Sequence, residues 1–475
     1  GFAGTETPSG QELAAAWAPD GRSVVFAAAV NHNEAAFAAV KTHLFQAPVE
    51  GGEPRPLTGG EGSYSRPEFR PDGRALAALY RREGGKLYSL SRIALFAWPA
   101  AGAPVIATGE FDRSVDSFAF TADSRTIWLL AEEAGHGKLF SLPAGGGQVR
   151  PAFEVKLGGY SGLAVPRKAQ GIFATFDSAV NPAEVVRIDP DAKSHRLLTS
   201  FNAAQAEAVD WQPLRHFWFT SRRGKRIHNM LVLPAGFDQQ KKYPLVALIH
   251  GGPHSMWRDQ FFLRWNYHLI AGSKYVLLLT GYTGSTGYGE EFAQQIQGDP
   301  LRGPGEEINE AVDEAVKRFA FVDGSRLAAG GASYGGHLAN WLQATTTRYR
   351  CLFSHAGLIN LESQWGTSDI IYHRELAGGG PPWEQGPVWR EQNPIRYARN
   401  FRTPMLLTVG ENDYRVPLNQ TLENWSVLQR QRVPSRLVVF PDANHWIQKG
   451  EDSRYFYREL ASWLDRWMMR SGSGC

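Results

Sequence analysis

The chain has 475 residues, of which 43% are hydrophobic and 20% charged, an ordinary composition for a globular protein of two or three domains. Its 50 basic and 47 acidic residues leave a net charge of +3 with no long run of like charge, so neither nucleic-acid binding nor a membrane-surface patch is indicated. The longest apolar runs have the length of strands and fall short of the roughly 18 apolar residues that a spanning helix needs.

Cysteine usage and the chain ends add little to the fold. Residues 471–475, which end in Cys475, form a Ser-Gly-Ser-Gly-Cys stretch that reads as a linker or tag-like tail. Cys351 then has no partner for an internal disulfide, and its apolar neighbours predict a place in the core. Since no initiator Met is present, a processed N-terminus leaves both cytoplasm and periplasm open as compartments. No group of residues has metal-ligand spacing, so neither a metal nor another cofactor is expected.

Residues 1–205 repeat two elements in step. A Pro-Asp-Gly-like turn occurs at 17–22, 69–74 and 120–125, with a weaker copy at 165–168. A pair of apolar residues recurs at positions 44, 95, 139 and 185, so successive copies are 51, 44 and 46 residues apart. A period of about 45 residues with several short strands per copy is typical of β-propeller blades, whereas an ordinary β-sandwich would not require both elements to repeat. About four blades are visible, so we expect a β-propeller that is small or incomplete in this chain.

From residue 206 to residue 470 the pattern changes to alternating strands and helices. The runs 243–249 and 275–279 are continuously apolar, which is typical of strands buried on both faces. The other expected elements are a hairpin of 217–221 and 227–233, strands at 327–330, 405–409 and 436–440, and helices at 308–319, from 336 onward, and at 456–467. This alternation predicts a mostly parallel sheet with helices on both faces.

The pattern G-x-S-x-G occurs at residues 331–335 and is followed by Gly336. A serine nucleophile has to lie on a sharp turn between a strand and a helix, with small residues on both sides that let neighbouring elements approach. The pattern alone carries a real risk of a chance match in a chain with 50 glycines. Its position between an apolar strand and a helix favours Ser333 as the nucleophile of an α/β-hydrolase domain.

The acid and the base follow from the order of residues along the chain. In the α/β-hydrolase fold the serine is followed by an Asp or Glu and then by a His. His445 is the one histidine after Asp413 and follows an expected strand, so we assign it as the general base. Asp413 lies just beyond the carboxyl end of a strand, where catalytic residues of α/β sheets gather, and would hold the imidazole in the required tautomer. The other acids considered are Asp369, in an irregular segment, Asp442, which is close to His445, and Glu411, the nearest rival.

A tetrahedral intermediate on Ser333 needs two preorganised hydrogen-bond donors for its oxyanion. The backbone N–H of Tyr334, directly after the nucleophile, is expected to be one of them. The second is expected from the His-Gly-Gly-Pro loop at 250–253, which follows an early strand. The spacing does not choose cleanly between Gly251 and Gly252, although Gly252 is favoured, and a plain Gly-Pro turn is the alternative.

Five motifs together carry a family resemblance. They are found, in chain order, at 250–253, 284–289, 331–336, 413–417 and 444–446. In this combination the chain resembles the prolyl oligopeptidase family, and within it the bacterial dipeptidyl peptidase and acylaminoacyl-peptidase members. The resemblance covers the whole α/β half and extends into the preceding repeats. It implies a peptidase whose propeller caps the active site and admits only short peptides.

The resemblance also implies residues that bind substrate. Arg415 matches a position whose side chain binds a backbone carbonyl of the substrate, with a surface ion pair as the alternative role. Tyr334 and Val416 match walls of the specificity pocket. Trp365 matches such a wall only loosely, and core packing explains it equally well.

Two features depart from that pattern. Relatives usually have seven or eight blades, whereas about four are visible, which puts size filtering and contacts from the propeller in doubt. Residues 298–302 differ from the glycine- and tryptophan-rich stretch common in relatives. Glu132 and Glu133 invite comparison with the paired acids that bind a free amino terminus in dipeptidyl peptidases, but they lie in an ordinary blade turn.

The leading hypothesis is therefore a serine peptidase that cleaves short peptides near the amino terminus and releases dipeptides or acylated amino acids. A carboxylesterase that uses the same three residues is the second hypothesis, and a non-catalytic propeller scaffold is the third. The expected partners are short peptides, with no nucleic acid and no membrane, and a homo-oligomer is left open.

Overall fold

The computed structural model describes residues 15–99, 102–168, 171–191 and 193–469. The expected linker or tag-like tail at 471–475 lies outside the described residues. The chain divides into two compact units. The first, here called the sheet unit, contains residues 1–177, 183–202 and 287–290, and the second, the α/β unit, contains residues 178–182, 203–286 and 291–475.

The sheet unit contains four sheets of four strands, and in each sheet the strands lie side by side in chain order. The first sheet has β1 (Ala15–Trp17), β2 (Ser23–Ala29), β3 (Thr42–Pro48) and β4 (Arg55–Pro56). The second has β5 (Gly62–Phe69), β6 (Ala75–Arg82), β7 (Ser91–Ala97) and β8 (Val105–Ile106). The third has β9 (Val115–Phe120), β10 (Thr126–Glu133), β11 (His136–Pro143) and β12 (Arg150–Pro151). The fourth has β13 (Gly159–Ala164), β14 (Ile172–Ser178), β15 (Asn181–Asp189) and β16 (Ser194–Leu197).

Each copy of the sequence repeat corresponds to one of these sheets. The repeated turn joins the first and second strands, and the repeated apolar pair lies in the third strand. Where the turn reverses the chain the backbone has a positive φ, at Gly21 (+67°), Gly73 (+73°) and Ser124 (+62°). The aspartate of the turn accepts a hydrogen bond from the backbone N–H two residues later, at 2.9 Å in Asp20, 3.0 Å in Asp72 and 3.1 Å in Asp123. Glu132 and Glu133 end β10 rather than lying in a turn, and Glu133 is paired with Arg113 and Lys138.

A separate apolar core lies between each sheet and the next. Because side chains alternate along a strand, β6 sends Leu76 and Ala78 into the core shared with the first sheet, and Ala77 and Leu79 into the core shared with the third. In the same way, β10 sends Ile127 and Leu129 into the core shared with the second sheet, and Leu130 into the core shared with the fourth sheet. The middle sheets are therefore buried on both faces, which explains their long apolar runs.

The α/β unit is built on one eight-stranded sheet of order β17-β18-β20-β19-β21-β22-β23-β24. The strands are β17 (Arg215–Thr220), β18 (Arg226–Val232), β19 (Tyr243–Ile249), β20 (Val276–Gly281), β21 (Val322–Ala332), β22 (Cys351–His355), β23 (Met405–Gly410) and β24 (Ser435–Phe440). β18 pairs antiparallel with β17 and β20, and all other pairs are parallel. The predicted parallel sheet is thus confirmed, with an antiparallel hairpin at one edge.

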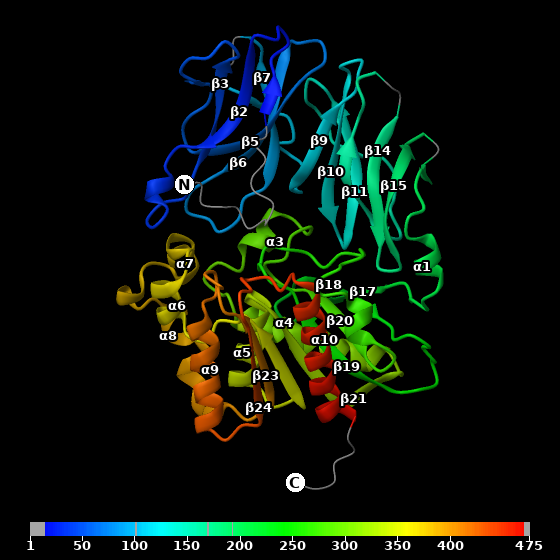
Figure 1. Ribbon diagram of the computed structural model, residues 1–475, viewed down its shortest axis with the longest axis vertical. Helices are drawn as coiled ribbons and strands as arrows, with labels where there is room; N and C mark the ends of the chain where they lie inside the picture. The colour runs from blue at the N-terminus through cyan, green and yellow to red at the C-terminus, as the bar shows by residue number, and fades with distance from the viewer. Residues whose placement is uncertain (1–14, 100–101, 169–170, 192, 470–475) are drawn as a thin grey trace. The chain divides into compact units, whose positions relative to one another are not determined.

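Helices cover both faces of this sheet (Figure 1). One face packs against α4 (Arg302–Arg318), α5 (Tyr334–Thr345) and α9 (Leu418–Arg430), and the other against α2 (Tyr267–Ala271) and α10 (Gly450–Leu464). β19 shows the alternation, because Leu245 and Ala247 face the first group of helices, whereas Val246 and Leu248 face the second. The shorter helices are α1 (Ala203–Glu207), α3 (Glu290–Gln294), α6 (Leu361–Thr367), α7 (Ile371–Gly378) and α8 (Pro387–Glu391). Short 3₁₀ helices lie at His32–Glu34, Pro382–Glu384 and Pro394–Asn400, and a π-helical turn at Asp465–Met469 ends the described chain.

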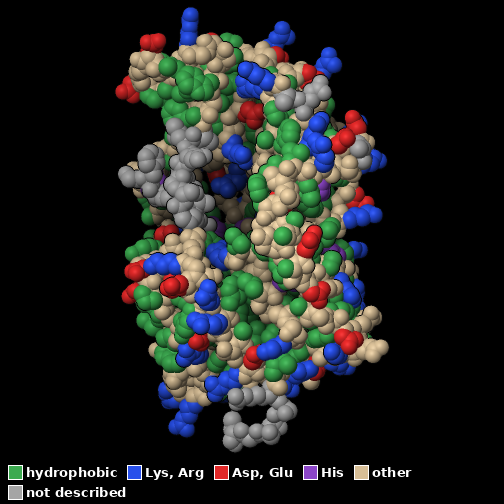
Figure 2. All heavy atoms as spheres, turned by 45° about the vertical axis from the view of Figure 1, so that its right-hand side comes forward, with side chains coloured by type: hydrophobic (Ala, Val, Ile, Leu, Met, Phe, Trp, Pro, Cys, Tyr) green, Lys and Arg blue, Asp and Glu red, His purple; other side chains and the backbone are tan. Residues whose placement is uncertain are grey.

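Most elements expected in the second half are found, with shifted ends. The helix expected from Gly336 begins at Tyr334, and the last helix gives way to the π turn before Trp467. Cys351 begins β22 and is fully buried, as its apolar neighbours predicted. Within the described ranges, no helix combines the length and apolarity needed to cross a membrane. On the face drawn in Figure 2, basic and acidic side chains are interspersed, in keeping with the net charge near zero.

Candidate active site

Ser333 lies on the turn between β21 and α5, in the α/β unit. Its backbone has φ +57° and ψ −120°, a conformation that a non-glycine residue rarely adopts and that costs about 1–3 kcal/mol. Backbone hydrogen bonds hold it there, because the Ser333 N–H donates to the carbonyl of His355 and the Ser333 carbonyl accepts from His337, both at 2.9 Å. The strained turn predicted from the sequence pattern is thus present.

The glycines of the pattern are needed because neighbouring strands approach this turn closely. A Cβ added at Gly331 would lie 2.1 Å from the carbonyl oxygen of Ile249, and one at Gly335 would lie 2.2 Å from the same atom. A Cβ at Gly336 would lie 2.8 Å from the Cα of Gly357. The end of β19 and the loop after β22 therefore leave no space for side chains at these three positions.

Asp413 and His445 form a hydrogen-bonded pair beyond the ends of β23 and β24. Oδ2 of Asp413 lies 2.7 Å from Nδ1 of His445. Oδ1 accepts the backbone N–H groups of Arg415 and Val416 at 2.9 and 2.8 Å. Because the carboxylate is buried and both of its oxygens are engaged, it can hold the imidazole in one orientation.

The other acids considered lie elsewhere. Glu411 is exposed, on the same loop as Asp413. Asp442 is exposed and lies 3.7 Å from Lys449. Asp369 pairs with Arg415, with oxygen–nitrogen distances of 2.7 and 3.3 Å. Of the four carboxylates, Asp413 is the one with a hydrogen bond to His445 among the described contacts.

Ser333 and His445 line one pocket of the α/β unit. Its walls are largely aromatic, and the one permanently charged side chain in it is that of Arg264. The complete lining consists of Arg264, Trp265, Ala332, Ser333, His355, His445, Trp446, Ile447, Ser453, Phe456 and Tyr457. His355 is buried beside the pocket with Nδ1 2.9 Å from Oγ1 of Thr408, and burial lowers its pKa to about 3. A pKa this low makes His355 a weak base, so it is a poor candidate for the general base.

The two expected oxyanion donors lie on elements that meet at Ser333. Tyr334 is the first residue of α5, so its backbone N–H has no carbonyl partner one turn earlier in the helix. In the loop 250–253, a Cβ added at Gly251 would lie 3.2 Å from Cβ of Ser333, whereas one at Gly252 would meet only its own loop, 2.8 Å from the His254 nitrogen. Gly252 has a φ of +116°. Gly251 is thus the loop residue that closely approaches the Ser333 turn.

A buried polar network fixes this loop. Nε2 of His250 lies 2.9 Å from Oγ of Ser285, and the hydroxyl of Tyr282 donates to the His250 carbonyl at 2.8 Å. The Tyr282 and His250 rings stack with their centroids 4.3 Å apart. Burial lowers the pKa of His250 to about 4, so the ring is neutral and can accept one hydrogen bond while donating another. The network joins two of the five family motifs.

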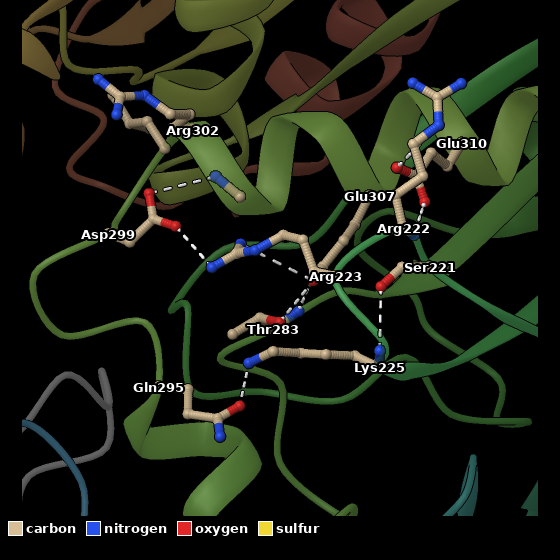
Figure 3. A network of polar contacts seen from close by, with 12 residues as sticks. Ser221, Arg222, Arg223, Lys225, Thr283, Gln295, Asp299, Arg302, Glu307 and Glu310 are labelled. Carbon is tan, nitrogen blue, oxygen red and sulfur yellow. Dashed lines mark hydrogen bonds and ion pairs between the residues drawn. The ribbon is translucent and has the colours of Figure 1, made fainter.

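A second network, which includes Glu307 of α4, holds Thr283, the residue after Tyr282 (Figure 3). Glu307 is fully buried, and its carboxylate accepts the N–H and the hydroxyl of Thr283, both at 2.7 Å. Arg223 reaches toward it, with Nη1 4.0 Å from Oε1 of Glu307 and Nη2 2.9 Å from Oδ2 of Asp299. The next residue, Pro300, accepts a hydrogen bond from the hydroxyl of Tyr334. Burial raises the pKa of Glu307. Through Asp299 and Pro300, the divergent segment 298–302 thus contacts Arg223 and Tyr334, the residue next to Ser333.

None of the four expected substrate-binding residues is in this pocket's lining, and three of them, Arg415, Val416 and Trp365, lie on neighbouring segments. Arg415 forms the ion pair with Asp369 that was considered as its alternative role. Val416 is buried in an apolar cluster against which Trp365 packs. Nε1 of Trp365 donates to Glu375 at 3.0 Å, and its ring meets that of Trp383 edge-on at 5.5 Å. The side chain of Tyr334 stacks on Tyr282 and is buried.

Several pocket residues were not anticipated from the sequence. Arg264 and Trp265 come from the loop before α2, and Phe456 and Tyr457 from α10. No local pattern marks these positions as functional. The one available signal is the position of Trp446 directly after His445.

Comparisons with known proteins agree with these observations. Residues 260–471 match the Prolyl oligopeptidase family. The chain is 28% identical over 460 residues to dipeptidyl-peptidase 5 of Porphyromonas gingivalis, covering 96% of this chain and 66% of that protein. It is 29% identical over 429 residues to dipeptidyl-peptidase 5 of Schizosaccharomyces pombe, covering 89% and 62%. The solved structure of Pyrococcus horikoshii acylaminoacyl peptidase superposes with a TM-score of 0.82 at 20% identity, covering 98% of this chain and 72% of that one.

The chain spans just under two thirds of the length of these dipeptidyl-peptidase relatives. At 20% identity, the solved structure supports the likeness of fold. The sequence matches include the α/β unit with its Ser333 turn and its Asp413–His445 pair. By its sequence matches and its fold, the chain is similar to members of the prolyl oligopeptidase family, and the match to the family itself covers residues 260–471.

Proposed function

We propose that this protein is a serine peptidase that cleaves short peptides near their amino termini, with Ser333 as nucleophile, His445 as general base and Asp413 as the acid that orients it. The observation that carries the proposal is that Ser333, on its positive-φ turn, and His445, bonded to the buried Asp413, line one pocket. The similarity to proteins named dipeptidyl peptidase and acylaminoacyl peptidase supports the choice of substrate class.

The reaction proceeds through an ester on Ser333. Its hydroxyl oxygen attacks the carbonyl carbon of the scissile amide while the hydroxyl proton passes to Nε2 of His445. The carbon–nitrogen bond then breaks, the proton passes from His445 to the leaving amine, and the acyl group remains on Ser333. A water molecule attacks this ester and gives a proton to His445. That proton returns to the Ser333 oxygen as the carboxylic acid leaves, so the enzyme is regenerated.

The remaining assignments belong to the same proposal. The backbone N–H groups of Tyr334 and Gly252 stabilise the oxyanion, with Gly251 as the neighbouring alternative in the same loop. Val416 and Trp365 form walls for the acyl side of the substrate. Arg415 binds a substrate carbonyl after its guanidinium leaves Asp369, because the ion pair occupies the donors that a carbonyl would need.

We also propose that the four sheets are blades of a β-propeller domain over residues 1–205 that precedes a catalytic domain over 206–470. Two observations support this architecture. Each sheet has its four strands in chain order, and an apolar core lies between each sheet and the next. In this family such a domain would restrict access to short peptides.

The first test compares wild type with Ser333→Ala on one short peptide, prepared with a free and with an acetylated amino terminus. We expect Ser333→Ala to lower kcat by roughly 10⁴-fold or more, because loss of a triad serine removes the covalent path. Mass spectrometry of the products gives the cleavage position. Ser435→Ala, a serine in β24, is the matched control and should retain wild-type turnover.

Each outcome selects one hypothesis. Release of a dipeptide from the free form alone indicates a dipeptidyl peptidase, and release of an acetyl amino acid indicates an acylaminoacyl peptidase. Turnover of simple esters without turnover of either peptide supports the carboxylesterase. Turnover by Ser333→Ala above about 1% of wild type contradicts the nucleophile assignment. If a fluorophosphonate fails to label Ser333 in the folded protein, the non-catalytic scaffold becomes the better explanation.

A further inference from the structure

The pocket of Ser333 and His445 contains one cationic side chain that the proposed reaction does not use. Arg264 lines the pocket, and none of the pocket's eleven lining residues is an Asp or a Glu. Within the described residues, no hydrogen bond or ion pair is recorded for its guanidinium, whose recorded contact is with the face of Trp446, 3.4 Å from the ring centroid. Burial lowers the pKa of Arg264 to about 10, so the group remains charged at neutral pH.

A half-buried guanidinium without a counterion is energetically costly, since it has lost part of its hydration without gaining a charged partner. Stacking on Trp446 recovers some of that cost, but it uses the face of the guanidinium and leaves its in-plane N–H donors available. Those donors suit a carboxylate, which accepts two parallel hydrogen bonds from an arginine. The pocket therefore has the chemistry of a carboxylate site.

The loop that presents Arg264 is held rigidly. Trp265 has a φ of +59°, and its ring meets Phe456 edge-on with centroids 5.1 Å apart. The backbone N–H of Asn266 donates to the hydroxyl of Tyr457 at 2.8 Å, and its side chain caps α2 by accepting the N–H of Leu269 at 3.0 Å. Because these contacts order the loop in advance, binding an anion there costs little conformational entropy.

The position of the pocket indicates which part of a substrate would reach it. In the proposed reaction His445 delivers a proton to the leaving amine, so the leaving group lies on the side of His445. The pocket contains His445 with its neighbours Trp446 and Ile447, whereas the expected acyl-side residues Val416 and Trp365 belong to a different cluster. The pocket thus fits the leaving side.

We propose that Arg264 binds the terminal carboxylate of the leaving residue, so that the preferred substrates end one residue after the scissile bond. In such a substrate the carboxyl carbon is two covalent bonds from the leaving nitrogen. Because His445 protonates that nitrogen, a side chain that binds the carboxylate has to line the same pocket as His445. This inference rests on the proposed peptidase function and adds to it a preference for peptides with a single leaving amino acid and a free carboxyl end.

The test measures kcat/KM for matched substrates that release one alanine as the free acid or as the carboxamide. We expect wild type to prefer the acid by about tenfold, as a charge-assisted hydrogen bond allows. Arg264→Gln should bring the acid-to-carboxamide ratio of kcat/KM close to one, and Arg264→Lys should retain part of the preference.

Arg430→Gln, which changes an exposed arginine on α9, is the matched control and should keep the wild-type ratio. A further substrate releases glutamate as its α-carboxamide, so that its one leaving-side carboxylate is on the side chain. If wild type preferred this substrate over the one that releases alanine as the free acid, the assignment to a terminal carboxylate would be overturned.

Two further measurements test the carboxylate site without the Arg264→Gln variant and distinguish its failure from failure of the proposed peptidase activity. If Arg264→Gln does not fold, wild type alone still decides, because alanine should then inhibit about tenfold more strongly than alaninamide. An aminocoumarin amide, which has no carboxylate, reports whether peptidase activity dependent on Ser333 exists at all. If that substrate is cleaved but wild type shows no preference for the acid, or Arg264→Gln keeps the preference, the carboxylate site is wrong and the peptidase stands. If no amide is cleaved, both fail.

Discussion

The two units of this chain build their interiors in different ways. In the sheet unit each core lies between one sheet and the next, and a single type of turn, with its aspartate and its positive φ, recurs along the chain. In the α/β unit one sheet carries the two large cores, and Ser333, Asp413 and His445 come from three separate loops. Sequence-local interactions thus dominate in the first unit. In the second, a few close approaches between distant segments determine whether a site exists.

The largest expected effect breaks one such approach. Gly335→Ala would place a Cβ 2.2 Å from the Ile249 carbonyl oxygen, so we expect a loss of about 3 kcal/mol or more in the free energy of unfolding, with the Ser333 turn displaced. Gly366 is also helical, but a Cβ there would meet nothing within 4 Å, and Gly366→Ala should stabilise the protein by about 0.5–1 kcal/mol. Urea unfolding of both variants measures the difference. Equal shifts in the two midpoints would show that the close approach is not needed.

An intermediate effect concerns acidification. The pKa values of His250 and His355 are lowered from 6.5 to about 4 and about 3, because burial in the α/β unit disfavours their charged forms. Below pH 6.5 the unfolded chain therefore binds protons that the folded chain does not. The free energy of unfolding should fall by about 1.4 kcal/mol per pH unit for each histidine as the pH drops toward 4.

Urea midpoints at pH 7.0, 5.5 and 4.5 test this slope. Other groups, among them Glu307 with its raised pKa, also contribute to the pH dependence, so the informative quantity is the difference between wild type and His355→Gln. The variant should show a shallower decline. A decline as steep as that of wild type would argue that His355 is not buried as a neutral ring.

The smallest expected effect concerns the repeated turn of the sheet unit. Asp72→Ala removes an exposed hydrogen bond to the N–H of Arg74 and the surface ion pair with Arg70, for which water largely substitutes, so its stability loss should be far below that of Gly335→Ala. Because the copies lie in different sheets, Asp20→Ala combined with Asp123→Ala should give the sum of the two single effects. Urea unfolding of the two single variants, Asp20→Ala and Asp123→Ala, and of the double variant measures this. Strong non-additivity would mean that the sheets do not act as local units.

The sequence predicted the features that depend on local chemistry or on chain order. The turn repeat located the first hairpin of all four sheets, and in the first three an aspartate meets the same backbone requirement of the turn. β19 was predicted at its observed bounds, since a strand buried on both faces is apolar throughout. The hydrogen bond of Asp413 with His445 follows the chain order of the fold, which requires no knowledge of packing.

What the sequence did not predict depends on contacts between distant segments. Arg264 enters the pocket because the loop before α2 is anchored to α10 through Asn266 and Tyr457, a contact across 191 residues. The pairing of Arg415 with Asp369, and the support of Tyr334 by Pro300, likewise join residues that no periodicity connects. Such contacts leave no trace in spacing, because each partner is an ordinary residue within its own segment.

The buried thiol of Cys351 has a practical consequence for kinetic experiments. It lies at the start of β22, between β21 and β23 in the eight-stranded sheet, and burial raises its pKa well above the ordinary range. Alkylating reagents attack the thiolate, so this side chain should react only during moments when the strand separates from its neighbours. In a variant with Cys475→Ser, the rate of alkylation would report how often the central sheet opens, without any added label.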